Sequence, residues 1–210
     1  MSDLHGQYDK FISMLSRIDF KESDTLYILG DIFDRGDKVL ELIDYISIKK
    51  NIVMLLGNHD NEVLNALENG DFYFWFSYGS NTYKKMLNRG EDYIFAVKQW
   101  LKKLPLYAIV DDKYILSHAT PIAFPAKNID DLMKSQEDDT LLWNRSTIGN
   151  ESNNVYKDYI FINGHTPTPT FNKEPNIVRR ANTIYIDCGA CFTDGRLACL
   201  RLDDMQEFYI

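Results

Sequence analysis

The strongest constraint on the fold is a pair of short apolar segments that each end in glycine followed by polar residues. Residues 25–31 read TLYILGD, and residues 52–60 read IVMLLGNHD. Apolar residues recur at helical spacing in residues 8–18 and 39–46, just before these segments. Helices and buried strands that alternate with short connections are typical of βαβ units. The sequence therefore predicts an α/β fold that begins with a largely parallel sheet.

The second half of the chain has a different pattern. A helix is expected at residues 94–104, and strands are expected at 106–110, 114–117, 159–162, 183–186, 197–202 and 207–210. The last three strands have no long helix between them, which predicts a second, more antiparallel sheet packed on the first. The pattern weakens from 123 to 156, where we expect a loop-rich cap. No linker or repeat interrupts the sequence, so residues 1–210 are predicted to form one domain.

Composition narrows the function classes. The chain has a net charge of −8, which disfavours nucleic acid and anionic membranes as partners. No apolar run approaches the ~20 residues needed to cross a bilayer, and no signal segment opens the sequence, so a cytoplasmic protein is expected. The three cysteines do not form a disulfide framework and are expected to pack as small apolar residues. The sequence does not indicate an oligomeric state.

Polar residues gather where the predicted strands end, and at the start of the chain. All four histidines lie in such places, next to Gly, Asp, Asn or Ser. Ligands bind at the carboxyl ends of strands in open α/β sheets, so we expect these side chains to converge. The candidate metal ligands are Asp3, His5, Asp31, Asn58, His118 and His165.

This mixture of imidazole and oxygen ligands suits manganese, iron or zinc better than calcium. Two divalent ions that share a bridging carboxylate can hydrolyse phosphate esters, and Asp31 is the candidate bridge. Asp3 and His5 would complete one ion. The second ion would take the remaining ligands, which are Asn58, His118 and His165.

Several motifs then resemble one known family. Residues 3–6 (DLHG), 30–36 (GDIFDRG) and 57–60 (GNHD) resemble the three-part signature of the phosphoprotein phosphatase (PPP) type of metallophosphoesterase. The later motifs agree: SH at 117–118, LWNR at 142–145, GHTP at 164–167 and YID-x-GA at 185–190. The resemblance covers essentially the whole chain and is greatest to the compact bacterial and phage (lambda-type) protein phosphatases. It implies an α/β/β/α sandwich of two mixed sheets flanked by helices, with two divalent ions, manganese first among them.

The resemblance also implies roles for four further residues. Asp34 would orient His59, and His59 would donate a proton to the leaving alkoxide. Arg35 and Arg145 would bind the phosphoryl oxygens. The nucleophile would be a metal-bridging hydroxide that attacks phosphorus directly, without a covalent enzyme intermediate.

Some of these residues have simpler interpretations. Asp34 and Arg35 could form a turn ion pair, and Asp60 is expected to be the N-cap of a helix rather than a catalytic residue. The aromatic cluster at residues 72–76 is expected to pack in the core rather than border a substrate groove. Asp187 is expected to hold a ring of His165 or His118.

The chain departs from the family at its start, since relatives carry an apolar strand before the first motif. Either the polypeptide begins upstream of Met1, or the sheet is one strand short and two ligands lie on a mobile end. A chain that begins at Met1 is expected to bind the metal at Asp3 and His5 weakly.

Three functions compete. The first is removal of phosphate from phosphoserine or phosphothreonine in proteins, or from a small phosphoester. The second is symmetrical hydrolysis of dinucleoside polyphosphates such as diadenosine tetraphosphate; many such enzymes lack the Asp of the DRG motif, so Asp34 favours the first. The third is an inactive scaffold, which the complete set of ligands and catalytic candidates disfavours.

Overall fold

The computed structural model describes residues 1–78, 81–151 and 155–210. In the first part, helix α1 (Tyr8–Arg17), strand β1 (Leu26–Ile28), helix α2 (Val39–Ile46), strand β2 (Ile52–Met54) and helix α3 (Asn58–Asn69) follow one another. β1 and β2 pair in parallel, with Leu26 opposite Ile52. The predicted βαβ unit is therefore confirmed, because an apolar helix connects two buried strands.

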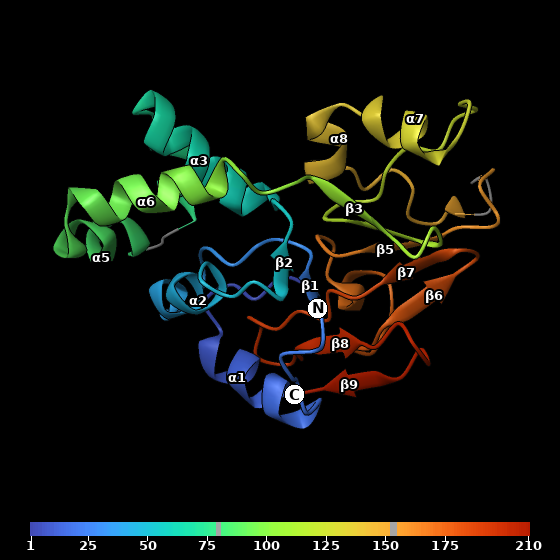
Figure 1. Ribbon diagram of the computed structural model, residues 1–210, viewed down its shortest axis with the longest axis horizontal. Helices are drawn as coiled ribbons and strands as arrows, with labels where there is room; N and C mark the ends of the chain where they lie inside the picture. The colour runs from blue at the N-terminus through green and yellow to red at the C-terminus, as the bar shows by residue number, and fades with distance from the viewer. Residues whose placement is uncertain (79–80, 152–154) are drawn as a thin grey trace.

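A helical arm follows β2 and lies apart from the strands on one side of the molecule (Figure 1). It consists of α3, α4 (Tyr73–Ser77), α5 (Thr82–Arg89) and α6 (Glu91–Leu101), and α6 lies against both α3 and α5. Apolar side chains join the arm to the main core, among them Trp75, Met86 and Val97. The predicted helix at residues 94–104 corresponds to α6, which begins and ends three residues earlier.

The largest sheet has five strands in the order β3-β4-β5-β7-β6. The strands are β3 (Tyr107–Val110), β4 (Tyr114–Ser117), β5 (Ile160–Asn163), β6 (Val178–Arg180) and β7 (Thr183–Tyr185). β4, β5 and β7 pair in parallel, while β3 and β6 join the two edges antiparallel. The centre of this sheet is parallel and both of its edges are antiparallel, which agrees with the expectation of a second sheet more antiparallel than the first; β6 was not predicted.

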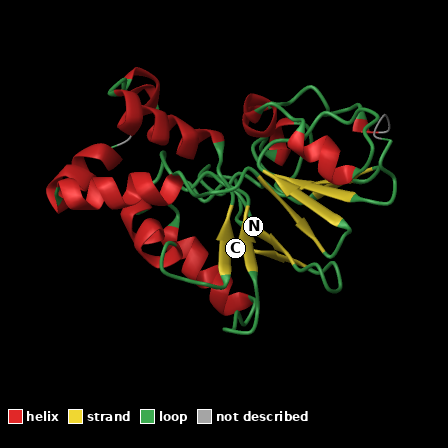
Figure 2. Ribbon diagram, turned by 45° about the horizontal axis from the view of Figure 1, so that its top comes forward, coloured by secondary structure: helices red, strands yellow, loops and turns green. Residues whose placement is uncertain are grey.

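Strands β8 (Ala198–Leu200) and β9 (Glu207–Tyr209) form an antiparallel pair close to α1. Side chains of the different sheets share one apolar cluster, in which Leu29 and Leu55 pack with Leu116 and Ile162 of the large sheet. A cavity of about 660 Å³ lies between β1 and β8. The architecture is a mixed α/β fold in which helices flank the sheets, as predicted (Figure 2).

The expected loop-rich cap contains two short helices, α7 (Ile129–Lys134) and α8 (Asp138–Trp143). Leu132 and Leu141 are buried in a small cluster with Ile115 and Phe161 of the large sheet. This packing explains why helices form where the sequence pattern is weak. Residues 152–154 of the expected cap lie outside the described residues.

The first residues of the chain lie beside β1. The backbone N–H of Leu29 donates to Met1 O at 3.0 Å, and the N–H of Asp3 donates to Gly30 O at 3.1 Å. Asp3 and His5 are therefore buried and anchored, rather than exposed as a loose end would be. Over the described residues, we find no helix long and apolar enough to cross a membrane.

Candidate metal centre

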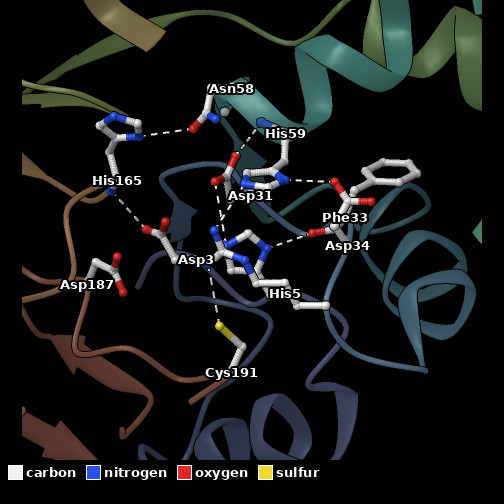
Figure 3. A network of polar contacts seen from close by, with 12 residues as sticks. Asp3, His5, Asp31, Phe33, Asp34, Asn58, His59, His165, Asp187 and Cys191 are labelled. Atoms are coloured by element: carbon white, nitrogen blue, oxygen red, sulfur yellow. Dashed lines mark hydrogen bonds and ion pairs between the residues drawn. The ribbon is translucent and has the colours of Figure 1, made fainter. Parts of the chain in front are cut away.

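The candidate ligands meet where the loops that follow the strands converge, between the helical arm and the large sheet (Figures 2 and 3). Asp31 lies just after β1, and Asn58 begins α3 just after β2. His118 follows β4 and His165 follows β5. β1 is parallel to β2, and β4 is parallel to β5, so the carboxyl ends of each pair lie at one edge of their sheet. The two edges lie next to each other in the folded chain.

Asp31 lies at the centre of the site. Its Oδ2 is 3.6 Å from Nε2 of His5 and 3.5 Å from Nε2 of His118. Two groups of potential ligand atoms, each within 4.8 Å, share this carboxylate: His5 with Asp31 and His59, and Asp3 with Asp31 and His118. A carboxylate common to two groups fits a bridge between two ions. Asp3 and His5, which the sequence analysis assigned to one ion, each belong to a group that contains Asp31.

Asn58 and His165 complete the side of the site around His118. Oδ1 of Asn58 lies 2.8 Å from Nε2 of His118 and 2.9 Å from Nδ1 of His165. The backbone N–H of His165 donates to Asp3 at 3.1 Å, which ties this loop to the N-terminal segment. All six expected ligands therefore lie in one buried cluster.

Backbone carbonyls orient two of the histidines. Nδ1 of His5 lies 2.6 Å from Phe33 O, and Nδ1 of His118 lies 2.7 Å from Leu29 O. Each contact places the ring proton on Nδ1 and leaves Nε2, which faces Asp31, unprotonated and able to bind a metal.

Burial adjusts the charges of these side chains. It lowers the pKa of His118, and it lowers the pKa of His165 to about 2 with the help of neighbouring His118. Burial, followed by the charge of Arg35, lowers the pKa of His5 as well. Neutral imidazoles are the form that binds metal, so the histidines are ready for it at neutral pH.

The carboxylates show the opposite effect. Burial, and then the negative charge of Asp3, raises the pKa of Asp31 well above its ordinary value. Two acidic side chains buried together are costly without a compensating cation. The cluster offers neutral nitrogen donors around crowded carboxylates, a donor set that fits divalent transition ions.

Asp60 fixes the loop that carries Asp31. Its carboxylate accepts the backbone N–H groups of Gly57, Asp31 and Ile32 at 2.9, 2.7 and 3.0 Å. The first contact helps to cap α3, although Gly57 rather than Asp60 is the N-cap residue. Asp60 is therefore not the N-cap residue that the sequence predicts, but it contributes to the cap from the first turn of α3 and also fixes the loop after β1.

The proposed acid pair is also buried. Nδ1 of His59 lies 2.7 Å from Oδ2 of Asp34, and Asp34 is completely buried. Nε2 of His59 lies 3.2 Å from an Arg35 nitrogen, and the other terminal nitrogen of Arg35 lies 3.0 Å from Nε2 of His5. Asp34 therefore pairs with the imidazole of His59, and Arg35 lies between the two histidines.

The two arginines flank the cluster from different elements. Nε of Arg145, just after α8, donates to Nε2 of His165 at 3.1 Å. Arg35 lies beside His5, with Cys191 Sγ at 3.5 Å. The two guanidinium groups thus lie on different sides of the carboxylate cluster, where their positive charge would attract an anionic substrate.

Sequence reasoning missed two contacts around His59. Nε1 of Trp75 donates to Oδ1 of Asp34 at 2.9 Å. The ring of Tyr78 lies over that of His59, with 4.3 Å between centroids. A single aromatic-rich segment gives no signal for such contacts, since its apolar composition predicts packing alone.

The expectation that residues 72–76 form core is correct only in part. Trp75 is 1% exposed, but Tyr73, Phe74 and Phe76 are 76%, 60% and 49% exposed. The contacts of Asp187 differ from the expected support of a histidine ring. Its carboxylate accepts the backbone N–H of Gly189 at 2.9 Å, a contact that shapes its own turn.

Residues 1–198 match the calcineurin-like phosphoesterase family. Because this match spans nearly the whole chain, the chain belongs to that family, and the resemblance to PPP-type metallophosphoesterases is confirmed. It is accordingly a metal-binding phosphoester hydrolase.

Two curated relatives cover most of the chain. It is 28% identical to serine/threonine-protein phosphatase 2 of Salmonella typhimurium (strain LT2), over 96% of this chain and 91% of that protein. It is 26% identical to the symmetrical bis(5'-nucleosyl)-tetraphosphatase of Buchnera aphidicola, over 94% of this chain and 69% of that protein. The relatives therefore divide between two substrate classes.

Solved structures share the fold. A candidate diadenosine tetraphosphatase superposes with a TM-score of 0.71 at 19% identity, covering 100% of this chain and 90% of that one. A serine/threonine phosphatase from Saccharomyces cerevisiae superposes with a TM-score of 0.60 at 16% identity, covering 88% and 64%. At this level of identity, the likeness concerns the fold alone.

Proposed function

We propose that this chain removes phosphate from phosphoserine and phosphothreonine in proteins. The supporting observation is the buried Asp34–His59 pair, with 2.7 Å between its oxygen and nitrogen atoms. A serine or threonine alkoxide is a poor leaving group, so a positioned proton donor accelerates its departure by ~10²–10⁴-fold. The leaving group of a dinucleoside polyphosphate is a phosphate oxygen, which is stable as an anion and gains little from a donor.

The proposed ligands of two divalent ions, manganese in the first instance, are Asp3, His5, Asp31, Asn58, His118 and His165. When bound, such ions supply a nucleophilic water at neutral pH and neutralise phosphoryl charge. The lowered pKa values of the histidines and the raised pKa of Asp31 support cation binding here.

The remaining roles belong to side chains of this chain. Arg35 and Arg145 bind the phosphoryl oxygens, for which a planar guanidinium is well suited. Asp34 holds the imidazolium form of His59 in place, and His59 gives its Nε2 proton to the departing oxygen. The oxygen that attacks phosphorus comes from water, so the chain forms no covalent intermediate.

A second candidate is symmetrical hydrolysis of dinucleoside tetraphosphates. The relative from Buchnera aphidicola favours it, as does the aromatic ring of Phe192, which is 49% exposed and 5.5 Å from the Arg35 guanidinium. An exposed ring beside a phosphate-binding arginine could stack on a nucleobase.

Initial rates measured with Mn²⁺ on a phosphoserine peptide and on diadenosine tetraphosphate distinguish the two candidate functions. We expect the higher kcat/KM on the peptide, loss of activity after chelation and recovery when Mn²⁺ returns. A preference for the dinucleotide would overturn the first proposal in favour of the second.

A further inference from the structure

The carboxylate of Asp34 has two partners, one on each oxygen. Oδ2 lies 2.7 Å from Nδ1 of His59, and Oδ1 accepts the indole N–H of Trp75 at 2.9 Å. Asp34 is 0% exposed and Trp75 is 1% exposed, so water does not compete for either contact. The indole of Trp75 fixes Oδ1 of Asp34, and the orientation of Oδ2 toward His59 therefore depends on this contact.

The indole itself is held in place by aromatic neighbours. Trp75 packs edge-on against Phe33 and Tyr83, with ring centroids 6.4 and 5.6 Å away, and stacks on Phe72 at 6.0 Å. Phe72 in turn contacts Tyr83 at 4.6 Å. Packing from several directions leaves the indole N–H one orientation, aimed at Asp34.

The segment that carries Trp75 also covers the imidazole. Tyr78 directly follows α4 and lies over the ring of His59 at 4.3 Å, while His5 meets that ring edge-on at 4.8 Å. The end of α4 thus contacts the pair twice, at the carboxylate and at the ring.

We propose that Trp75 is a positioning residue for protonation of the leaving group, acting through Asp34 on His59. This inference rests on the proposed function. When the P–O bond breaks, the serine oxygen keeps the electron pair of that bond and takes the Nε2 proton of His59, while water forms the new bond to phosphorus and releases one proton to solvent. Rotation of Asp34 away from His59 would misdirect that proton without moving the ligands around Asp31.

The test compares leaving groups in the Mn²⁺-loaded Trp75→Phe variant. We expect kcat on phosphoserine peptide to fall by about 10–100-fold, the range for loss of a supporting hydrogen bond, with KM unchanged. On 2,4-dinitrophenyl phosphate we expect less than about a twofold change, because its leaving group departs as a stable anion. Equal losses on both substrates would overturn the proposal.

A double-mutant cycle shows whether the two residues act together. If Trp75 acts through Asp34, the Trp75→Phe/Asp34→Asn variant loses no more activity than Asp34→Asn alone. Additive losses would contradict that coupling. Trp100→Phe is the matched control: it removes a half-buried indole from α6 in the same helical arm and should leave both substrates unaffected.

Two further measurements guard against misfolding and against a wrong substrate class. If Trp75→Phe does not fold, benzothienylalanine at position 75 keeps the ring shape and removes only the N–H donor. If the wild type hydrolyses no alkyl phosphomonoester, the proposed function fails, and the Nδ1 proton of His59 is followed by NMR in the metal-free protein. Its downfield resonance should weaken or shift in the position-75 variant, and an unchanged resonance would refute the role of Trp75.

Discussion

Replacing Gly57 by alanine tests how closely the loops after β1 and β2 must approach. The backbone of Gly57 is extended (φ −98°, ψ 171°), so alanine adopts it without strain. The added methyl group would, however, overlap the backbone nitrogen and the carboxylate of Asp31. Relief requires a displacement of about 1 Å, since carbon atoms keep ~3.5–4.0 Å from their neighbours. Overpacking of this kind costs about 1–3 kcal/mol of folding stability.

The effect on metal binding should exceed the effect on stability. Asp31 belongs to both groups of ligand atoms, and metal–ligand distances tolerate about 0.2 Å. We therefore expect Gly57→Ala to weaken Mn²⁺ binding by at least about 10–100-fold, the loss typical of disturbed supporting contacts. Isothermal titration calorimetry measures the affinity, and urea unfolding of the metal-free protein measures the stability.

Gly70→Ala provides the matched control. Gly70 ends α3 in the left-handed conformation (φ 73°), and a methyl group there would meet nothing within 4 Å. It should cost about 1–2 kcal/mol through backbone strain alone and leave metal affinity unchanged. If Gly57→Ala binds two metal ions as tightly as the wild type, the close approach of the two loops does not define the site.

Three further predictions concern the centre itself. His59→Asn should lower kcat on phosphoserine peptide by ~10²–10⁴-fold while metal content by mass spectrometry stays near the wild-type value; loss of metal would instead make His59 a ligand. Mn²⁺ binding should release protons below the raised pKa of Asp31, because the metal-free carboxyl is then protonated, so affinity rises with pH. Calorimetry in buffers of different ionisation enthalpy counts these protons. The pKa of His165 is lowered to about 2, so this residue should release no proton on metal binding near neutral pH. If the His165→Ala variant alone lost the proton release seen in the wild type, this account would be wrong.

The elements that position the site were predictable because their signals are local. The apolar run before Asp31 and the one before Asn58 each become a parallel strand, and both residues lie in the turns that follow. The four histidines next to turn residues could be assigned to one site for the same reason. Their convergence depends in addition on the packing of the two sheets, because β2 and β4–β5 belong to different sheets.

The remaining features depend on tertiary contacts that the sequence does not display. Helices α7 and α8 have six residues each, too short to be stable without the buried contacts of Leu132 and Leu141. The contact of Trp75 with Asp34 joins residues 41 positions apart, and a tryptophan among aromatic residues predicts only burial. The sequence could likewise not show how Asp3 is anchored, since this follows from the backbone contacts of Met1 and Asp3 beside β1.

The backbone conformation of the site explains why so many supporting contacts surround it. Eleven non-glycine residues among those described have a positive φ, and six of them are candidate ligands or catalytic residues: Asp3, His5, Asp31, Asp34, Arg35 and His165. The left-handed conformation costs roughly 1–2 kcal/mol per residue, so it persists only where other contacts fix it. Asp60 supplies such contacts around Asp31 by accepting consecutive backbone N–H groups, and Trp75 supplies one at Asp34. The turns direct side chains from separate strands toward one point, and the buried hydrogen bonds hold them there.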